Sequence, residues 1–441
     1  MLDQGAHGMF GYYIDLALRS FRRNKALTAL MVLAIGLGIG ASMTTLTVMR
    51  LLSGDPLPER SGRLFYPQVD PKPAEPHELP GQMTYIDAMN LWRAQRADRQ
   101  AIMVGSNVKV KAAETGAKPM GLHTLATTAD FFPMFGVPFI HGGPWTAADD
   151  AGKARVAVLS RSAYERLFRG RDGIGQPIRL GRWAFRVVGV IEDWRPAPHF
   201  YDLDREAYGQ GDDVFIPFLT SRDLAELGIT GYSLDCYGNT TDDIHLENQP
   251  CLWLKFWVEL DSPAKVHAYR RFLDNYSHEQ QAQGRFTYAG VPHVALPGMM
   301  QWLDQNGVVP ADARLKAWIA FGFLLVCLMN TTGLLLAKFL QRGAEISVRR
   351  ALGASRRQVF FQCLVEAAMV GVAGGVLGLV LAGAGLWGIR QTPADYADLA
   401  HLDATMFATT FVLSIAASFV AGLLPAWRAC HIAPAIQLKT L

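Results

Sequence analysis

The sequence is poor in charged residues and in cysteine. Only 18% of its 441 residues are Asp, Glu, Lys or Arg, and 42 basic against 39 acidic residues leave a formal net charge of +3. Soluble domains usually contain nearer a quarter charged residues, so the composition favours a membrane protein. The near-neutral balance gives no reason to expect a nucleic-acid partner. Five cysteines, with ordinary proline and glycine contents, exclude disulfide-scaffold, collagen-like and disordered classes.

A catalytic or metal-binding pattern is also missing. His199, His245 and His293 are far apart and lack metal-ligand spacing, so no metal site is predicted. The acidic pairs Asp212-Asp213 and Asp242-Asp243 are interpreted as solvated loops rather than as a catalytic dyad. The phosphate-binding pattern G-x-x-x-x-G-K-[S/T] does not occur either. We therefore predict no catalytic residue, no directly bound cofactor and no enzyme activity for the chain alone.

Against these absences stand four long runs without a charged residue. They cover residues 26–49, 317–337, 367–389 and 404–427, and each is long enough to cross a bilayer as a helix. Buried core helices are the alternative, but they rarely run so far without a charge. The first run is too long for a secretion signal and has no small-x-small cleavage site, so we expect an uncleaved anchor. Because no ionisable residue lies inside the runs, an ion-coupled secondary transporter is disfavoured.

Charge segregation predicts which side of the membrane each segment faces. The segments 1–25, 338–366 and 428–441 hold twelve Lys or Arg against four Asp or Glu, whereas 390–403 holds one Arg and three Asp. By the positive-inside rule, both termini and 338–366 are cytoplasmic. Residues 50–316 are then external, and we call them the ectodomain. We therefore predict an α-helical membrane protein with four transmembrane helices in a one-plus-three order and a large domain between the first and second helix.

The ectodomain has the pattern of an α+β fold. It opens with a proline-rich connection over 56–80. Its length is sufficient for two lobes, which we divide somewhere within 200–250. Hydrophobic alternation and capping signals predict a buried strand at Val156–Leu159, a helix to Phe168 capped by Ser160 or Ser162, a β-hairpin over 178–190, a buried strand at Cys251–Leu260 and a helix over 263–283.

Cys236 and Cys251 are the only cysteines of the ectodomain. A disulfide between them would close a loop of about 15 residues and contribute about 3 kcal/mol by restricting the unfolded chain. Two unpaired thiols remain the alternative.

The predicted cytoplasmic segments contain two helical patterns. In 1–25, apolar residues from Phe10 to Phe21 recur at helical spacing, which predicts an interfacial amphipathic helix. In 338–366, Lys338–Leu352 is expected to continue the second transmembrane helix, and Gly353 suits the left-handed position that ends it. Ser355-Arg356-Arg357-Gln358 is then a capping box that opens a helix into the third run. We call 338–366 the elbow; an ordinary connecting hairpin is the alternative.

Small residues recur four apart in the first and third runs. Such spacing lets helices approach closely, either within one chain or between two copies. The predicted packing residues are Gly36, Gly40, Gly371, Gly374, Gly375 and Gly378.

Several segments resemble the FtsX-like permeases of ABC transporters. Glu345–Gln358 resembles the cytoplasmic signature of that family, and Ala17–Lys25 resembles the helix that precedes its first span. The segments that are similar to the periplasmic core domain of macrolide-exporter (MacB) type permeases are Ala129–Phe132, Val156–Ser160, Ile174–Ile178 and Val187–Val190. The match runs in order over nearly the whole chain.

The resemblance implies the permease subunit of an ATP-driven exporter in a bacterial inner membrane, with the ectodomain in the periplasm. MacB itself carries its ATPase on the same chain, whereas this sequence has no phosphate-binding loop. A separate ABC ATPase subunit would therefore bind ATP and Mg and move the ectodomains by mechanotransmission. A second permease would complete a homodimer or heterodimer, and a periplasmic adaptor and an outer-membrane duct are further candidate partners. The implied cargo is an antibiotic, a peptide or another small molecule.

The resemblance also implies a coupling function for the elbow, with Gly353 and Ser355 setting its shape and the charged residues facing the ATPase. The predicted coupling residues are Glu345, Arg349, Arg350, Gly353, Ala354, Ser355 and Arg356. Alternatives within the superfamily are a permease that extracts lipoproteins and a subunit that signals to a cell-wall hydrolase. A receptor that works without ATP is the alternative from another class.

Overall fold

The structure, a computed structural model, divides into two compact units. It describes residues 16, 19–21, 24–72, 78–112, 118–205, 207–242, 245–287, 293–309, 311–392, 399 and 404–431. One unit is Met1–Ser53 with Val309–Leu441, and the other is Gly54–Val308. The amphipathic helix expected over 1–25 lies mostly outside the described residues, as do most of 390–403 and most of 428–441.

Four long helices form the first unit in the part of the chain described. They are α2 (Lys25–Ser53), α10 (Ala311–Gln341), α12 (Arg356–Arg390) and α13 (Ala404–Cys430). Each contains a stretch long and apolar enough to cross a membrane. They cover the four runs found in the sequence, so the prediction of four transmembrane helices is confirmed. A shorter helix, α11 (Gly343–Ala351), follows α10.

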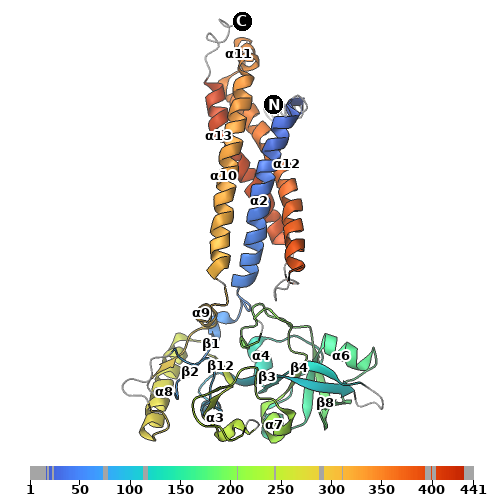
Figure 1. The fold of residues 1–441 in the computed structure, drawn as a ribbon, viewed down its shortest axis with the longest axis vertical. Helices are drawn as coiled ribbons and strands as arrows, with labels where there is room; N and C mark the ends of the chain where they lie inside the picture. Colours follow the sequence, from blue (N-terminus) through green and yellow to red (C-terminus); the bar gives the residue numbers. More distant parts are fainter. Residues whose placement is uncertain are drawn as a thin grey trace, which may run out of the picture. The chain divides into compact units, whose positions relative to one another are not determined.

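The four long helices run side by side as a bundle (Figure 1). α2 packs against α10 and α12, and α13 packs against the same two helices. Met31, Ile35, Ile39 and Met43 of α2 are fully buried in this bundle. Residues four apart form the ridges by which helices interlock. Outward-facing apolar side chains such as Trp318, which is 77% exposed, are typical of a surface that meets lipid.

The second unit is built on a nine-stranded mixed sheet. The pairs β4–β9 and β6–β8 are parallel, and the other pairs are antiparallel. In order across the sheet, the strands are β1 (Leu64–Phe65), β12 (Lys255–Glu259), β3 (Arg99–Ala112), β4 (Met120–Thr127), β9 (Val214–Pro217), β6 (Val156–Ser160), β8 (Trp183–Ile191) and β5 (Phe139–Gly142), while β7 (Pro177–Leu180) pairs with β3 and β8. Two small antiparallel sheets join β2 (Gln68–Val69) to β13 (Val294–Ala295) and β10 (Asp235–Cys236) to β11 (Cys251–Leu252).

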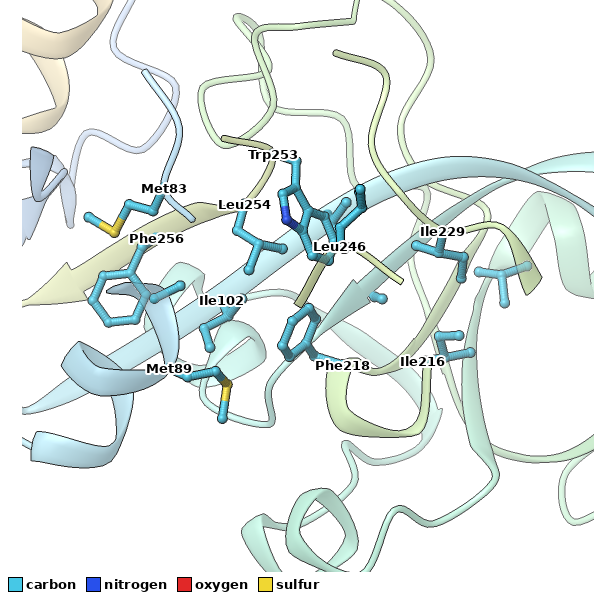
Figure 2. Packing of buried hydrophobic residues seen from close by; sticks show 14 of the residues in the cluster. Met83, Met89, Ile102, Ile216, Phe218, Ile229, Leu246, Trp253, Leu254 and Phe256 are labelled. Carbon is cyan, nitrogen blue, oxygen red and sulfur yellow. The ribbon is translucent and has the colours of Figure 1, made fainter. Parts of the chain in front are cut away.

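The large sheet has an apolar cluster on each face, because successive side chains of a strand point to opposite faces. On β3, Ile102 belongs to one buried cluster and Met103 to the other. Figure 2 shows part of the first cluster, where Ile102 lies with Phe218 and Met89. The helices over the first cluster are α3 (Tyr85–Ala94), α6 (Arg161–Phe168), α7 (Phe218–Asp223) and α8 (Pro263–Ala282), and those over the second are α4 (Phe131–Phe135) and α9 (Met299–Gln305).

Most local predictions for the ectodomain are confirmed. Ser160 ends β6 and caps α6, since its Oγ accepts a hydrogen bond from the Ala163 N–H at 3.1 Å. β7 and β8 form the expected hairpin, and α8 begins at Pro263 as predicted. These features depend on neighbouring residues alone.

Predictions that depend on distant pairing need correction. The strand expected at Cys251–Leu260 is divided into β11 and β12, because Leu254 pairs with Met83 between them. The proline-rich segment 56–80 contains β1 and β2. The two expected lobes share one sheet, because β12, which follows the predicted division, lies between β1 and β3.

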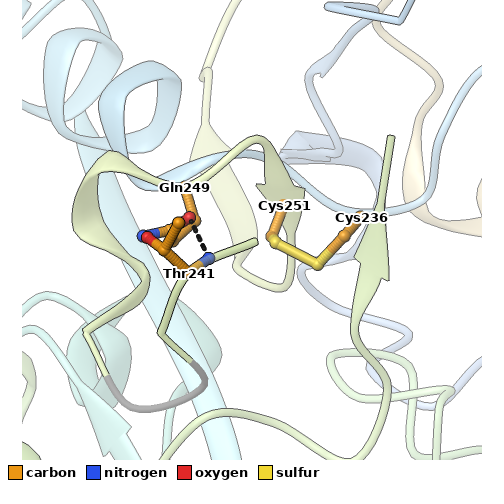
Figure 3. Close-up of a disulfide and its surroundings, with 4 residues drawn as sticks. All are labelled: Cys236, Thr241, Gln249 and Cys251. Atoms are coloured by element: carbon orange, nitrogen blue, oxygen red, sulfur yellow. Dashed lines mark hydrogen bonds between the residues drawn. A yellow bond between two sulfur atoms is a disulfide. The ribbon is translucent and has the colours of Figure 1, made fainter. Parts of the chain in front are cut away.

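Cys236 and Cys251 form a disulfide (Figure 3). The two residues are direct partners in the antiparallel β10–β11 pair. Within the enclosed loop, the Thr241 N–H donates to Gln249 Oε1 at 3.3 Å, and Gln249 Nε2 donates to Thr241 Oγ1 at 3.1 Å. Of the two alternatives for these cysteines, the structure therefore has the bonded one.

Replacing both cysteines by serine is expected to lower the free energy of unfolding of the ectodomain by about 3 kcal/mol, because the unfolded chain regains the freedom that the bond removes. Urea unfolding of the purified chain, followed by tryptophan fluorescence, measures the change. Cys327→Ser, which alters a free cysteine of the helical unit, is the control and should leave the ectodomain transition in place. An unchanged transition in the double variant would contradict the prediction.

Candidate functional site: the elbow between α10 and α12

The elbow contains the short helix α11 and two turns. Gly353 has a φ of +101°, the left-handed conformation expected at the end of a helix. Ser355 caps α12, because its Oγ accepts from the Gln358 N–H at 3.3 Å. The Ser355 N–H donates in return to Gln358 Oε1 at 2.8 Å. The helix end at Gly353 and the capping box are therefore confirmed.

The helix expected to run unbroken over Lys338–Leu352 is interrupted at Arg342. The Arg342 N–H bonds to the Phe339 carbonyl at 3.2 Å, three residues back rather than four. Gly343, a weak helix former, follows it. The Arg342 side chain turns toward α12, where Nη1 lies 3.2 Å from Glu366 Oε2. The prediction of one continuous helix was wrong, and α11 is a separate helix.

The predicted coupling charges of α11 bind its neighbours. Arg349 Nη2 lies 2.7 Å from Glu345 Oε1 on the same helix, and Arg349 Nη1 donates to Gln362 Oε1 of α12 at 3.2 Å. Arg350 Nη1 donates to the Cys430 carbonyl of α13 at 3.3 Å. These side chains therefore attach α11 to two of the long helices. That they also face an ATPase stays a prediction.

The end of α11 exposes two apolar side chains. Leu352 is 84% exposed, and Val348, one turn earlier on α11, is 49% exposed. Residues four apart share one face of a helix, so these two side chains form a ridge. The following Gly353–Arg356 turn is exposed except for half-buried Ala354. We call Val348, Leu352 and Gly353–Arg356 the elbow surface.

The sequence did contain a signal for this ridge. Val348 and Leu352 are apolar residues four apart in a segment that is otherwise rich in arginine. Since the segment was interpreted through its charges, the apolar pair was missed.

A buried charge cluster that joins the two ends of the elbow was missed as well. Glu366 of α12 is 4% exposed at its side chain, and its Oε1 lies 2.7 Å from Nζ of Lys338, which is fully buried. Its Oε1 also accepts from the Ser20 hydroxyl, and its Oε2 faces Arg342. In the sequence, Lys338 and Glu366 border two apolar runs and look like ordinary flanking charges. We call Ser20, Lys338, Arg342 and Glu366 the Glu366 cluster.

All six glycines predicted for packing lie against a neighbouring helix of this chain. A Cβ placed on Gly36 would lie 2.8 Å from Leu377 of α12, closer than carbon atoms approach in proteins. The same crowding occurs between α2 and α12 at Gly40, Gly374 and Gly378, and between α12 and α13 at Gly371 and Gly375. Of the two alternatives left by the sequence, packing within one chain thus occupies each of these positions.

Gly371→Ala is expected to destabilise the helical unit by about 1–3 kcal/mol, because the added methyl group collides with Ser418 of α13. Gly383→Ala on the same helix is the matched control, since nothing lies within 4 Å of a Cβ there. Thermal unfolding in detergent, followed by circular dichroism, compares the two variants. Equal behaviour of both would contradict the assigned helix contact.

The ectodomain contains a buried ring of four polar side chains. Arg205 donates from Nη2 to His199 Nδ1 at 3.1 Å and from Nη1 to Asp212 Oδ1 at 3.2 Å. The Tyr201 hydroxyl contacts His199 Nε2 and donates to Asp212 Oδ2 at 2.8 Å. Burial raises the pKa of Asp212 to about 6 and lowers the pKa of His199. Asp212 is 1% exposed at its side chain, so its interpretation as a solvated loop residue was wrong.

His199, Tyr201, Arg205 and Asp212 lie on the loop between β8 and β9. A second buried charge cluster holds this loop against the sheet. Lys255 of β12 is 5% exposed at its side chain, and its Nζ lies 2.5 Å from Asp202 Oδ1 and 2.6 Å from Asp204 Oδ2. The side chains of each cluster bind other members of the same cluster. The loop is therefore held both by its own ring of polar side chains and by Lys255 of the sheet.

The remaining candidates for chemistry are separate from these clusters. Asp213 pairs with Arg166, and Asp242 Oδ1 accepts from the His245 N–H at 3.0 Å. His293 Nδ1 lies 3.5 Å from Asp70 Oδ2, and Asp243 lies outside the described residues. Among the residues that the structure describes, no three His, Cys, Asp or Glu side chains come together as metal ligands.

Four apolar helices with a large inserted α+β domain define a multi-span membrane protein. Residues 28–274 match the family model of the MacB-like periplasmic core domain, and residues 317–434 match that of the FtsX-like permease C-terminal region. The chain belongs to the family of FtsX-like ABC transporter permeases with a MacB-like periplasmic core domain.

Its curated relatives include exporters with an ATP-binding part. The macrolide export ATP-binding/permease protein MacB of Marinobacter nauticus is 24% identical over 96% of this chain and 60% of that protein. The pyoverdine export ATP-binding/permease protein PvdT of Pseudomonas putida is 25% identical over the full chain and 62% of that protein. MacB of Azoarcus sp. is 26% identical over 69% of this chain and 40% of that protein. The chain thus spans between 40% and 62% of the length of these relatives.

Among solved structures, the periplasmic region of MacB from Actinobacillus actinomycetemcomitans aligns with 58% of this chain and 97% of that one. The identity is 13% and the TM-score is 0.36. The family assignment rests on the two family models.

Proposed function

We propose that this chain is the permease subunit of an ATP-driven exporter. In this proposal both termini and the elbow lie in the cytoplasm, and the ectodomain lies in the periplasm. A separate ABC ATPase subunit binds the elbow surface and hydrolyses ATP with Mg²⁺, and a second permease completes a dimer. Displacement of the elbow moves the long helices, and the helices move the ectodomain.

The exposed ridge of Val348 and Leu352 carries the proposal. Single exposed apolar residues are common, but Leu352 is 84% exposed at the end of α11, where a short turn leads to the capped start of α12. Arg356 is exposed in the same turn, and arginine is enriched among the residues that dominate binding at interfaces. The predicted coupling charges Arg349 and Arg350 bind α12 and α13, so a force on α11 would reach both helices.

Mechanical transmission is also supported by how the bundle satisfies its polar groups. The buried hydroxyl groups of Thr47, Thr331, Thr410 and Ser418 each donate to a carbonyl four residues earlier on their own helix. Groups that are used in this way are poor ligands for a polar cargo. The described helices therefore favour a moving scaffold over a polar path between them.

The names of the relatives support export as the outcome of this motion. They are designated as exporters of macrolides and of pyoverdine. We propose an organic small molecule of comparable kind as the cargo.

The proposal is tested by co-expressing the full chain with ABC ATPase subunits from its own organism and reconstituting the complex in liposomes. We expect a stable complex with vanadate-sensitive ATP hydrolysis, and ATP-dependent movement of erythromycin or pyoverdine as probes. Absence of any ATPase that assembles with the chain would overturn the proposed function. Assembly without movement of either probe would overturn only the cargo class.

A further inference from the structure

We propose that Glu366 is a positioning residue that fixes the N-terminal segment and α10 against α12. The inference goes beyond the proposed exporter function, because it concerns how this chain holds its own helices. It rests on the Glu366 cluster, in which residues from three segments meet at one carboxylate.

The geometry makes Glu366 the common acceptor. Its Oε1 binds the Ser20 hydroxyl of the N-terminal segment and Lys338 Nζ of α10, and its Oε2 binds Arg342 just beyond the end of α10. Lys338 also lies over the Phe21 ring, 5.1 Å from its centroid. Among the described residues, Glu366 is the one carboxylate paired with Lys338.

Because the cluster is buried, removing the charge of Glu366 should strongly disturb the packing around it. Lys338 is 0% exposed and the Glu366 side chain 4% exposed, so neither charge has water as an alternative partner. Removing one member of a buried ion pair leaves the other charge uncompensated, which is far more costly than removing both. Neutralising Glu366 alone should therefore push Lys338 and the attached segments away from α12.

The cluster is linked to α11 through α12. Gln362, one turn before Glu366 on α12, accepts from Arg349 of α11. Arg350 of the same helix binds the last turn of α13. The N-terminal segment, α10, α11, α12 and α13 are thus joined within a few turns of one another, and Glu366 holds the N-terminal segment through the Ser20 hydroxyl.

The thiol of Cys363 can report whether the packing around Glu366 is intact. Cys363 lies one turn before Glu366 on α12 and is 4% exposed. In the full chain reconstituted in nanodiscs, we expect Glu366→Gln to speed modification of Cys363 by N-ethylmaleimide at least about tenfold, as read by peptide mass. Glu345→Gln is the matched control, because it neutralises a half-exposed carboxylate paired with Arg349. Wild-type protection in Glu366→Gln, or equal opening in the control, would overturn the proposal.

A double variant separates positioning from space filling. Lys338→Met with Glu366→Leu removes the two buried charges and fills their volume with apolar groups. The third charge, Arg342, is 16% exposed at its side chain and can turn to water, so Cys363 should again be protected. Ser20 nevertheless lacks its acceptor, and the N-terminal segment should come free. We expect tryptic cleavage after Arg19 to be at least about fivefold faster than in wild type, although the thiol is protected. If cleavage also returns to the wild-type rate, Glu366 only fills space and the proposal is wrong.

None of these measurements needs an ATPase. Failure of the chain to bind an ATPase would therefore overturn the proposed function and leave the outcome for Glu366 unaffected.

Discussion

Replacing Leu352 by Glu is expected to weaken binding of the proposed ATPase subunit by at least about 30-fold. Central apolar anchors of interfaces are worth about 2 kcal/mol or more, which corresponds to that factor. The substitution adds a charge that would be buried on binding, and this raises the cost further. Because Leu352 is 84% exposed in the chain itself, the fold should be unaffected.

The measurement is the affinity of nanodisc-embedded permease for the ATPase by biolayer interferometry, together with ATP hydrolysis of the complex. Leu352→Met is the matched control and should bind within about twofold of wild type, because it keeps an apolar side chain of similar volume. Protection of Cys363 from maleimide verifies that each variant is folded. Wild-type affinity of Leu352→Glu would show that the ATPase binds elsewhere.

The second large effect is expected in the ectodomain, where Lys255→Met should lower the free energy of unfolding by about 3–5 kcal/mol. The lysine is buried against Asp202, whose side chain is 3% exposed, and also pairs with Asp204, whose side chain is 26% exposed. Without Lys255 the negative charges of Asp202 and Asp204 remain close together with no cation between them, which is the costly way to break a buried pair.

Lys265→Met is the matched control for this prediction. Lys265 also binds two carboxylates, Asp98 and Asp261, but its side chain is 44% exposed and water can replace it. The expected loss of unfolding free energy is much smaller than that of Lys255→Met, because exposed ion pairs contribute little. Urea unfolding of both variants at one pH gives the comparison. Similar losses in the two variants would contradict the assigned difference in burial.

The features that could be predicted from the sequence depend on near neighbours or on composition. The capping box at Ser355 involves residues three apart, and the left-handed turn at Gly353 follows from the freedom of glycine. The four long helices follow from uncharged runs. The pairing of Cys236 with Cys251 could be proposed because the ectodomain has no other cysteine.

The features that were missed depend on residues far apart in the chain. Lys338 and Glu366 look like flanking charges until α10 and α12 place them against each other. Asp212 looks like a loop residue until Tyr201 and Arg205 enclose it. The position of β12 between β1 and β3 likewise depends on pairing over about 150–200 residues, for which no local pattern exists.

The ectodomain begins and ends at strands that pair with each other. β2, near its start, is hydrogen-bonded to β13, near its end, and β1 is hydrogen-bonded to β12. Within the helical unit, α2 packs directly on α10, so these two helices contact each other without help from the ectodomain. The ectodomain is therefore an insertion into a helical hairpin that is complete without it. Evolution can lengthen, exchange or redesign such an insertion between the two points where the chain enters and leaves it, at Gly54 and Val308, while the helical unit remains the same.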